Sequence, residues 1–365
     1  MYPIKMDELL KTMVEKGASD LHIVVGSPPM IRVHGILEPV AEETLSPAAA
    51  QELVAAIMSK PDSDMLMDQR EVDFAYSLPG VSRFRVNACF QRDSVSAVMR
   101  AIPGLPPALE KMGLPPICTE ITKKPRGLVV VTGPTGSGKS TTLAAMINYI
   151  NRTEAVRIVT IEDPIEFLHN NVKSVISQRE VGRDTLSFHN ALRSALRQDP
   201  DVILVGEMRD LETISLALTA AETGHLVFGT LHVTSAPETI NRIVDVFPTG
   251  AQEQVRLQLA GVLEAVFTQT LIPRSDGNGR VCAMEILVGT HGVRNLIREN
   301  KSAQMMNAIQ TGSSAGMISL DKCLANFVAD GFITLDAAME KSSHPEELRR
   351  LCSESTPKPR YASSF

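Results

Sequence analysis

Short apolar runs alternate with helix-like segments between residues 127 and 232 of the chain. Four of these runs, GLVVV, RIVTI, DVILV and HLVFG, are dominated by Val, Ile and Leu. Strands covered on both faces show such continuous runs, whereas half-exposed strands alternate apolar with polar residues. The pattern therefore predicts a parallel sheet flanked by helices, which is an α/β domain with right-handed crossover connections.

The pattern differs over residues 1–102, where a small α+β domain is predicted. A segment with helical period, MDELLKTMVEKG, precedes the strand-like runs DLHIVV and PPMIRVHGIL. A second helix is predicted in LSPAAAQELVAAIMSK, with Ser46 as its N-cap and Pro47 at its first position. The runs EVDFAYSL, SRFRVNACFQ and SVSAVMRAI are typical of antiparallel strands, and a Pro79–Gly80 turn separates the first two.

A stretch rich in proline lies between the two patterns. Six prolines occur in the 25 residues PGLPPALEKMGLPPICTEITKKPRG, a density that interrupts regular structure and favours a linker over residues 103–120. The second domain is then predicted over residues 121–365, with a helical part from about residue 290. The tail SESTPKPRYASSF is predicted to be mobile. The length of 365 residues agrees with two domains.

Composition excludes several classes of protein. The net charge of −6 disfavours a broad electrostatic contact with nucleic acid or an anionic membrane. The absence of Trp and the 4% aromatic content also disfavour stacking platforms for single-stranded nucleic acid. No apolar run approaches the roughly 20 residues that span a bilayer, and MYPIKMDELLKTMVEKGASD lacks the apolar centre of a signal peptide. We therefore expect a cytoplasmic protein.

The five cysteines are scattered and include no C-x-x-C pair. This spacing disfavours a disulfide framework and a zinc ribbon. Buried free thiols are the expected state of Cys89, Cys118, Cys282, Cys323 and Cys352.

The run GPTGSGKST follows the first apolar strand and matches G-x-x-x-x-G-K-[ST] in full. Its glycines let backbone amides turn toward a β-phosphate, Lys139 can reach the β- and γ-oxygens, and Ser140 can ligate Mg²⁺. The helix-compatible segment TTLAAMINYI follows and adds its positive N-terminal end. The sequence therefore predicts a site for ATP and Mg²⁺ at Gly133, Pro134, Thr135, Gly136, Ser137, Gly138, Lys139, Ser140 and Thr141.

Two later strands end in acidic residues. VTIEDPIEF places Glu162, Asp163 and Glu166 at the edge where α/β sheets bind ligands. DVILVGEMRD ends in Glu207, the position from which a Walker B acid organises Mg²⁺ or its water shell. Acids after strands also cap helices, and the residues alone do not rank Glu162 and Glu207 by role.

Two histidines flank the last apolar run, GHLVFGTLHVTSA. His225 and His232 have no third ligand nearby that would complete a metal site, and either could be a structural histidine. His232 lies beside the hydroxyls of Thr230 and Thr234. It is therefore a candidate to sense or orient a γ-phosphate.

The segments GPTGSGKST, IEDPIE, ILVGEMRD and GHLVFGTLH, in this order, closely resemble those of the secretion ATPase superfamily. Within it, nearly the whole chain is similar to the type IV pilus retraction ATPases, the PilT family. The resemblance implies a PAS-like N-terminal domain, a RecA-like ATPase domain and a ring of six identical subunits. It also implies retraction powered by nucleotide-driven domain rotation, at the cytoplasmic base of the pilus. An inner-membrane pilus platform protein would be the partner and the only link to the membrane.

The resemblance also implies roles for single residues. Glu162 corresponds to the catalytic base and Glu207 to the Walker B acid, while His225 joins the nucleotide-binding residues and His232 the catalytic ones. RFRVNACFQRDSVSAVMRAI resembles the arginine-bearing strands of the family. Arg85 and Arg100 are therefore candidates to neutralise charge on the γ-phosphate, although a strand-edge arginine is ordinarily a solvated charge.

A further segment, GVRNLIREN, has the period of an amphipathic helix. It resembles the retraction-linked motif AIRNLIRE, with Gly292 and Val293 in place of the first two residues. A glycine there is expected to loosen the start of the helix. Four alternatives stay open: an extension or secretion ATPase of the same superfamily, an accessory paralogue of the retraction motor, a RecA-like DNA motor, and a regulatory subunit that hardly hydrolyses ATP. The first generally carries a tetracysteine insertion that this chain lacks.

Overall fold

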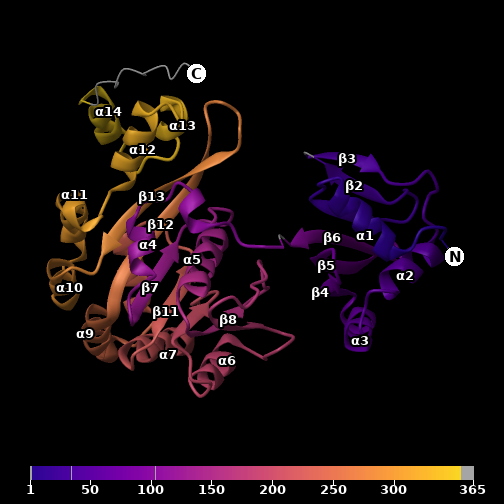
Figure 1. The fold of residues 1–365 in the computed structure, drawn as a ribbon, viewed down its shortest axis with the longest axis horizontal. Coiled ribbons are helices and arrows are strands. Elements are labelled where there is room, and N and C mark those ends of the chain that lie inside the picture. The colour runs from indigo at the N-terminus through magenta and orange to yellow at the C-terminus, as the bar shows by residue number, and fades with distance from the viewer. Residues whose placement is uncertain (1, 34, 103, 355–365) are drawn as a thin grey trace. The chain divides into compact units, whose positions relative to one another are not determined.

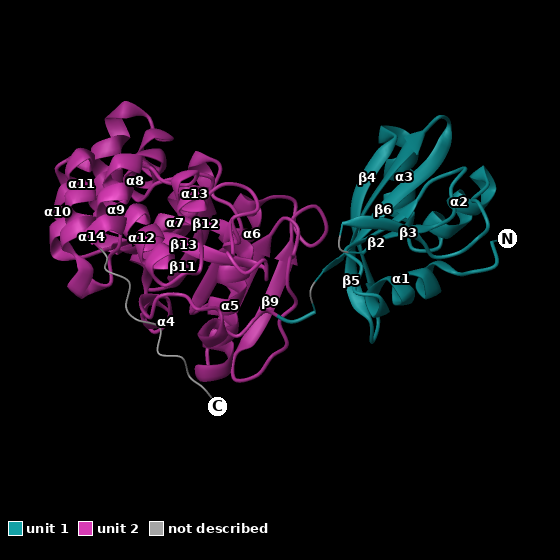
Figure 2. Ribbon diagram, turned by 90° about the horizontal axis from the view of Figure 1, so that it is seen from above, with its two compact units in different colours: residues 1–105 teal, residues 106–365 magenta. Residues whose placement is uncertain are grey.

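The computed structural model describes residues 2–33, 35–102 and 104–354. The chain divides into two compact units, residues 1–105 and 106–365 (Figures 1 and 2). Each unit has its own hydrophobic core. The tail from residue 355 onward and Pro103, at the start of the predicted linker, lie outside the described residues.

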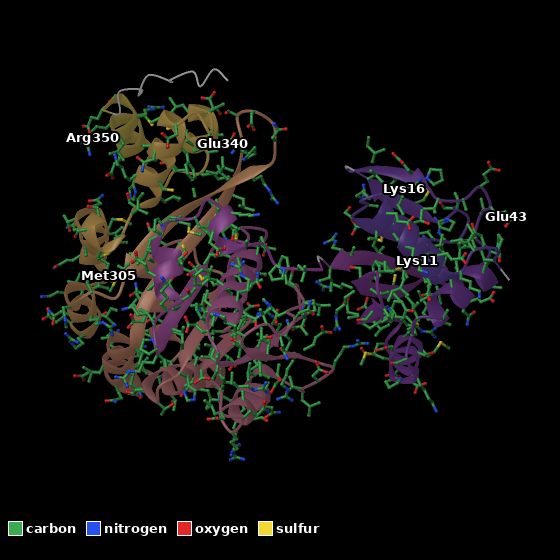
Figure 3. All side chains as sticks on the ribbon, in the orientation of Figure 1. Lys11, Lys16, Glu43, Met305, Glu340 and Arg350 are labelled. Atoms are coloured by element: carbon green, nitrogen blue, oxygen red, sulfur yellow. The ribbon has the colours of Figure 1, made fainter. Side chains whose placement is uncertain are left out.

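Unit 1 is a six-stranded antiparallel sheet of order β3-β2-β1-β6-β5-β4, with helices packed on its apolar face. In β5, Phe84 and Val86 are buried while Arg85 and Asn87 are exposed, which is the alternation of a sheet with one covered face. Lys11 of the first helix and Lys16, which directly follows that helix, are exposed (Figure 3). The elements are α1 (Met6–Glu15), β1 (Asp20–Ile23), β2 (Met30–Val33), β3 (Ile36–Pro39), α2 (Pro47–Ala55), α3 (Lys60–Gln69), β4 (Glu71–Leu78), β5 (Ser82–Gln91) and β6 (Ser94–Ile102).

Helix α3 is an element that the sequence analysis missed. Its segment KPDSDMLMDQ is mostly polar and buries only Leu66, so it has no strong apolar stripe. A capping box starts it: the backbone N–H of Asp62 donates to Ser59 Oγ at 3.3 Å, and the N–H of Ser59 donates to Asp62 Oδ2 at 3.2 Å. This reciprocal pair, with Pro61 in the first turn, is the signal that could have predicted the helix.

The proline-rich stretch is mostly part of unit 2 and not an extended linker. Residues 106–120 belong to that unit and contain the 3-10 turn η1 (Leu109–Lys111) and the start of α4 (Ile117–Ile121). Leu109 and Cys118 are buried in its core. The prolines bound these short elements, and Pro116 is the N-cap of α4.

Unit 2 is built on a seven-stranded sheet of order β13-β12-β7-β11-β10-β8-β9. All its neighbours pair in parallel except β12 and β13. The four predicted strands are adjacent in it: β7 (Gly127–Thr132), β11 (Leu226–Leu231), β10 (Val202–Val205) and β8 (Arg157–Glu162). The strands that the sequence analysis did not predict are β9 (Val175–Glu180), β12 (Leu263–Pro273) and β13 (Arg280–Val288).

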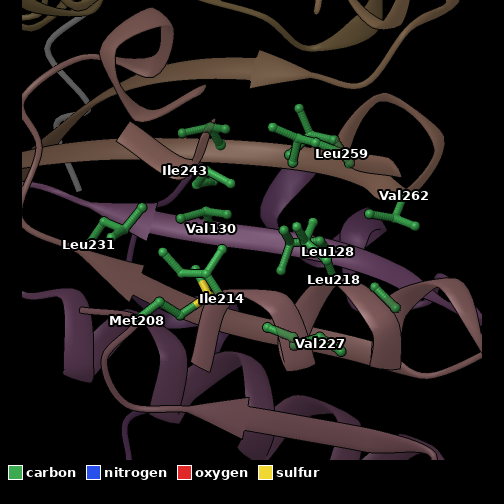
Figure 4. Packing of buried hydrophobic residues seen from close by; sticks show 14 of the residues in the cluster. Leu128, Val130, Met208, Ile214, Leu218, Val227, Leu231, Ile243, Leu259 and Val262 are labelled. Carbon is green, nitrogen blue, oxygen red and sulfur yellow. The ribbon is translucent and has the colours of Figure 1, made fainter. Parts of the chain in front are cut away.

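Both faces of this sheet are covered. Leu128 and Val130 of β7 lie in one hydrophobic core, while Val129 and Val131 of the same strand lie in another. Figure 4 shows the first core, where strand residues meet helical residues such as Leu218. The helices before residue 290 are α4, α5 (Lys139–Thr153), α6 (Phe188–Ala195), α7 (Leu211–Glu222), α8 (Ala236–Asp245) and α9 (Gln252–Val262), with the 3-10 turn η2 (Thr249–Ala251).

From residue 291 to residue 354 the chain is mainly helical, as the sequence predicts. No helix in the described parts of the chain has both the length and the apolar character needed to cross a bilayer. All five cysteines are free, but only Cys118 and Cys323 are fully buried. The elements are α10 (His291–Arg298), η3 (Ser302–Gln304), α11 (Met305–Thr311), η4 (Ser313–Ala315), α12 (Leu320–Ala329), α13 (Leu335–Met339) and α14 (Pro345–Glu354).

Candidate nucleotide-binding site

A cavity of about 410 Å³ opens in unit 2 at the carboxyl ends of four neighbouring strands, β7, β11, β10 and β8. This is the edge at which open α/β sheets bind ligands. The cavity brings together the P-loop and the acidic residues that the sequence singled out. It is lined by Thr135, Gly136, Ser137, Gly138, Lys139, Ser140, Thr141, Leu143, Ala144, Glu162, Asp163, Pro164, Glu166, His169, Phe188, Leu204, Gly206, Glu207, Thr230, His232, Leu271 and Arg280.

The P-loop is held tightly against β12. Gly133 has φ of +135°, and a Cβ there would lie 2.3 Å from the carbonyl oxygen of Gln269. Only glycine fits such a position. The side-chain amide of Gln269 donates to the carbonyl of Ser137 at 2.7 Å, and both residues are buried. Strand β12, which the sequence analysis did not predict, therefore fixes the shape of the loop.

Lys139 lies inside the P-loop at the start of α5. Its Nζ donates to the carbonyls of Gly133 at 2.8 Å and Pro134 at 3.1 Å, and the side chain is nearly buried. Burial lowers the pKa of Lys139, and the charge of Glu207 acts in the opposite direction. The charge of Glu207 thus acts on the P-loop lysine. Gly133 and Pro134 accept these hydrogen bonds from Lys139 through their carbonyls, and they do not line the cavity.

The two candidate acids lie at the carboxyl ends of adjacent strands, with Glu162 the last residue of β8 and Glu207 two residues beyond β10. The parallel register pairs Val205 of β10 with Ile161 of β8, and the N–H of Gly206 donates to the carbonyl of Ile161 at 2.7 Å. A Cβ on Gly206 would lie 3.2 Å from the Cα of Glu162, so the glycine permits this close approach. Glu162 and Glu207 consequently lie at neighbouring positions of the same sheet edge.

Two side chains donate hydrogen bonds to one carboxylate oxygen of Glu162. Thr160 Oγ1 donates to Glu162 Oε1 at 2.6 Å, and Gln178 Nε2 donates to the same atom at 3.2 Å. Burial raises the pKa of Glu162, and the bonds from Thr160, Gln178 and the backbone of Glu166 act against it. A carboxylate with a raised pKa takes up a proton more readily, which suits a general base.

Glu207 contacts two basic side chains. His232 Nε2 lies 3.4 Å from its Oε1, and Arg209 donates to the same carboxylate. The hydrogen bond to Glu207 raises the pKa of Arg209. The structure therefore places His232 in the cavity beside Glu207. The Ser140 hydroxyl and the Glu207 carboxylate both line the cavity and are oxygen donors of the kind that Mg²⁺ prefers.

The structure corrects the prediction for His225. This residue precedes β11, and the register pairs Leu226 with Gly127 at the amino end of β7. The P-loop begins six residues further along, so His225 lies about 20 Å away, at the opposite edge of the sheet. Its Nδ1 lies 2.8 Å from the carbonyl of Ala220. His225 is thus a structural histidine in this unit.

Several lining residues were missed by the sequence analysis. Leu271 and Arg280 come from β12 and β13, and Phe188 begins α6. His169 follows the acidic segment, and burial lowers its pKa to about 4, so its imidazole is neutral at pH 7. Its position in the run IEDPIEFLH, close behind the acids, is the one sequence signal that could have indicated it.

The two candidate arginines lie in unit 1, on adjacent strands. Arg85 of β5 and Arg100 of β6 are directly opposite in the antiparallel register, so their side chains share one face. Arg100 Nε donates to Asp20 Oδ1 at 2.8 Å, whereas Arg85 lies 4.0 Å from Asp73. Burial acts to raise the pKa of Asp20, but hydrogen bonds from Ser19 and Arg100 outweigh it and the pKa is lowered. Both guanidinium groups remain largely exposed.

The segment RNLIRE forms most of α10. Thr290 caps the helix, accepting from the N–H of Val293 at 3.3 Å, so its start is fixed despite Gly292. Arg294 makes four hydrogen bonds: it donates to the carbonyls of Gly289, Ala260 and Gly261 and to the carboxylate of Glu264. It joins α10 to the end of α9 and the start of β12.

Arg294→Ala is expected to lower the free energy of unfolding by about 2–3 kcal/mol, because four hydrogen bonds of a mostly buried guanidinium are lost together. Arg298→Ala is the matched control, since Arg298 is exposed and its side chain hydrogen-bonds, among the described residues, only Asn295 of its own helix, at 3.4 Å. Its effect should stay within about 0.5 kcal/mol. Urea unfolding of both variants measures the difference, and equal midpoints would contradict the structural role of Arg294.

Comparison with known proteins agrees with this geometry. The family described as "Type II/IV secretion system protein" matches residues 3–340. The "Type IV pilus retractation ATPase PilT" of Pseudomonas aeruginosa is 54% identical over 339 residues, which are 93% of this chain and 98% of that protein. A "Twitching motility protein" of Neisseria gonorrhoeae is 51% identical, over 93% of this chain and 91% of its own length. The crystal structure of the pilus retraction motor PilT with bound ADP superposes with a TM-score of 0.90, at 48% identity, covering 95% of this chain and 99% of that one. These similarities confirm the predicted fold class.

Proposed function

The chain belongs to the type II/IV secretion system protein family, and within it to the PilT ATPases, and from this premise we propose that it powers the retraction of type IV pili and so supports twitching motility. The observation that carries the proposal is the single cavity in which Lys139, Ser140, Glu162 and Glu207 meet. A complete set of this kind is what phosphoryl transfer to water needs. It disfavours a regulatory subunit that only binds nucleotide.

Each residue of the cavity has a distinct task in the proposed hydrolysis. The P-loop amides and Lys139 bind the β- and γ-phosphates of ATP. Glu162 accepts a proton from water as the water oxygen bonds to the γ-phosphorus and the bond to the β–γ bridging oxygen breaks. Mg²⁺, held by Ser140 and Glu207, would neutralise charge on the phosphate oxygens. His232, beside Glu207, orients the terminal phosphate.

The proposal extends to assembly and partners. We place Arg85 and Arg100 among the groups that neutralise the γ-phosphate, as arginine fingers do elsewhere. The working form is a ring of six copies, in which differential binding of ATP and its products drives rotation between the two domains. The ring acts in the cytoplasm at the pilus base, on the inner-membrane platform protein, without nucleic acid and without direct insertion in the membrane.

Deletion of the gene tests the direction of the motor. Loss of a retraction motor leaves pili that extend and cannot return, so we expect excess surface pili without twitching motility. Complementation with the wild-type gene should restore motility, and complementation with Glu162→Gln should not. Loss of pili would instead indicate an extension ATPase. Unchanged pili and motility would indicate an accessory paralogue. ATPase activity that requires DNA would indicate a DNA motor.

A further inference from the structure

Gln178 occupies the centre of β9, the edge strand beside β8. The parallel register pairs it with Thr160, and Thr160 and Glu162 are two residues apart on β8, so their side chains point to the same face. Gln178 lies outside the P-loop and outside the Walker motifs. Its strand was also missed by the sequence analysis, so the residue was not among the predicted site residues.

The side-chain amide of Gln178 makes three hydrogen bonds. Its Nε2 donates to Glu162 Oε1 at 3.2 Å and to the carbonyl of Phe167 at 2.8 Å. Its Oε1 accepts from the N–H of His169 at 2.8 Å. One amide therefore joins the candidate base to the loop of residues 163–169, which lines the cavity with Glu166 and His169.

The geometry points to Gln178 as a positioning residue that aims Glu162 at the attacking water. This inference rests on the proposed role of Glu162 as general base. Gln178 and Thr160 both donate to Oε1, which leaves Oε2 as the oxygen that neither of them engages. These two donors and the backbone of Glu166 restrict the orientation of the carboxylate. In the proposed arrangement Oε2, which neither side chain engages, takes the proton from water.

Ionisation of Glu162 depends on the same contacts. Burial raises the pKa of Glu162, and the amide of Gln178 stabilises the ionised form. Loss of this donor raises the pKa further, so a larger fraction of the base is protonated at a given pH. The ascending limb of the pH–rate profile must then move to higher pH. A side chain that only stabilised the fold would not produce this shift.

Gln178→Ala in the full-length protein tests the inference, with single-turnover hydrolysis measured across pH so that product release does not mask the chemical step. We expect a rate about 10–100-fold lower with unchanged affinity for ATP. We also expect the ascending limb to move up by about one pH unit. The matched control is Ser177→Ala, which removes one side-chain bond, to Arg157 at 2.8 Å, from the opposite face of β9. The control should keep both rate and profile.

Gln178→Glu provides a second variant in case the alanine variant does not fold. It keeps the size of the side chain but replaces the donor with a negative charge, so the limb should move further than in Gln178→Ala. A lowered rate with an unmoved limb in both variants would overturn the positioning role. So would wild-type rates. If Glu162→Gln retains turnover, Glu162 is not the base and the proposed function of this residue fails. If Glu162→Gln is inactive while the Gln178 variants keep the wild-type rate and pH profile, only the inference about Gln178 fails.

Discussion

Glu162→Gln is expected to lower the rate of ATP hydrolysis by about 10³-fold while ATP binding is retained. The amide has nearly the same shape but cannot accept a proton from water. In the proposed site Lys139 and the P-loop amides bind the phosphates and Glu162 does not, so affinity should change little. Steady-state phosphate release measures the rate, and titration with a fluorescent ATP analogue measures the affinity.

Glu222→Gln is the matched control for this substitution. Glu222 ends α7, is exposed, and accepts a hydrogen bond from Gln258 at 3.2 Å, away from the cavity. Its variant should hydrolyse ATP at the wild-type rate. Because the pKa of Glu162 is raised, the wild-type rate of hydrolysis should fall as the pH falls through the pKa of Glu162. This dependence of the rate on pH should be absent in Glu162→Gln. Turnover at the wild-type level in Glu162→Gln would remove the residue from the role of base.

The central strands of unit 2 could be predicted from the sequence because strands that are buried on both faces consist of nearly continuous apolar residues. Strands β7, β10 and β11 are buried at every residue, so their runs are purely apolar or nearly so. Strand β9 lies at the sheet edge, is only partly buried and carries the polar run SQRE. Strand β12 follows α9 directly, with no turn residue to separate them. Neither has a local signal that distinguishes it from helix or loop.

The candidate site also has a part that local sequence predicts and a part that it does not. The P-loop, Glu162, Glu207 and His232 all lie at the carboxyl ends of predicted parallel strands, and these ends meet at one edge of the sheet. His225 precedes its strand and so lies at the other edge. The back wall of the cavity, with Leu271 and Arg280, depends on long-range pairing of β12 with β7. Such pairing brings together residues more than 100 positions apart, and no local pattern encodes it.

Arg85→Ala is expected to lower the rate of ATP hydrolysis by about 10³-fold or more, if the guanidinium neutralises charge on the γ-phosphate in the transition state. Stability should be nearly unchanged, because Arg85 is exposed and its contact with Asp73 is 4.0 Å long. Arg100→Ala should lower the rate similarly, but it also removes a donor from the buried carboxylate of Asp20, so its melting temperature should fall. Arg32→Ala is the control, since the side chain of Arg32 hydrogen-bonds only the carbonyl of Gly35 among the described residues.

Mixing two inactive variants extends this test to the ring. Glu162→Gln subunits keep both arginines, and Arg85→Ala subunits keep the base. If base and arginine come from different subunits, a mixed ring contains some complete sites, and a mixture of the two variants should hydrolyse ATP faster than either alone. If both come from one subunit, no mixture regains activity. Wild-type rates for Arg85→Ala and Arg100→Ala would instead show that these arginines are solvated surface charges. Recovery in the mixture would mean that ATP is hydrolysed only where one copy of the chain meets the next. Hydrolysis would then be coupled to motion between subunits, because neither protomer could complete the site alone.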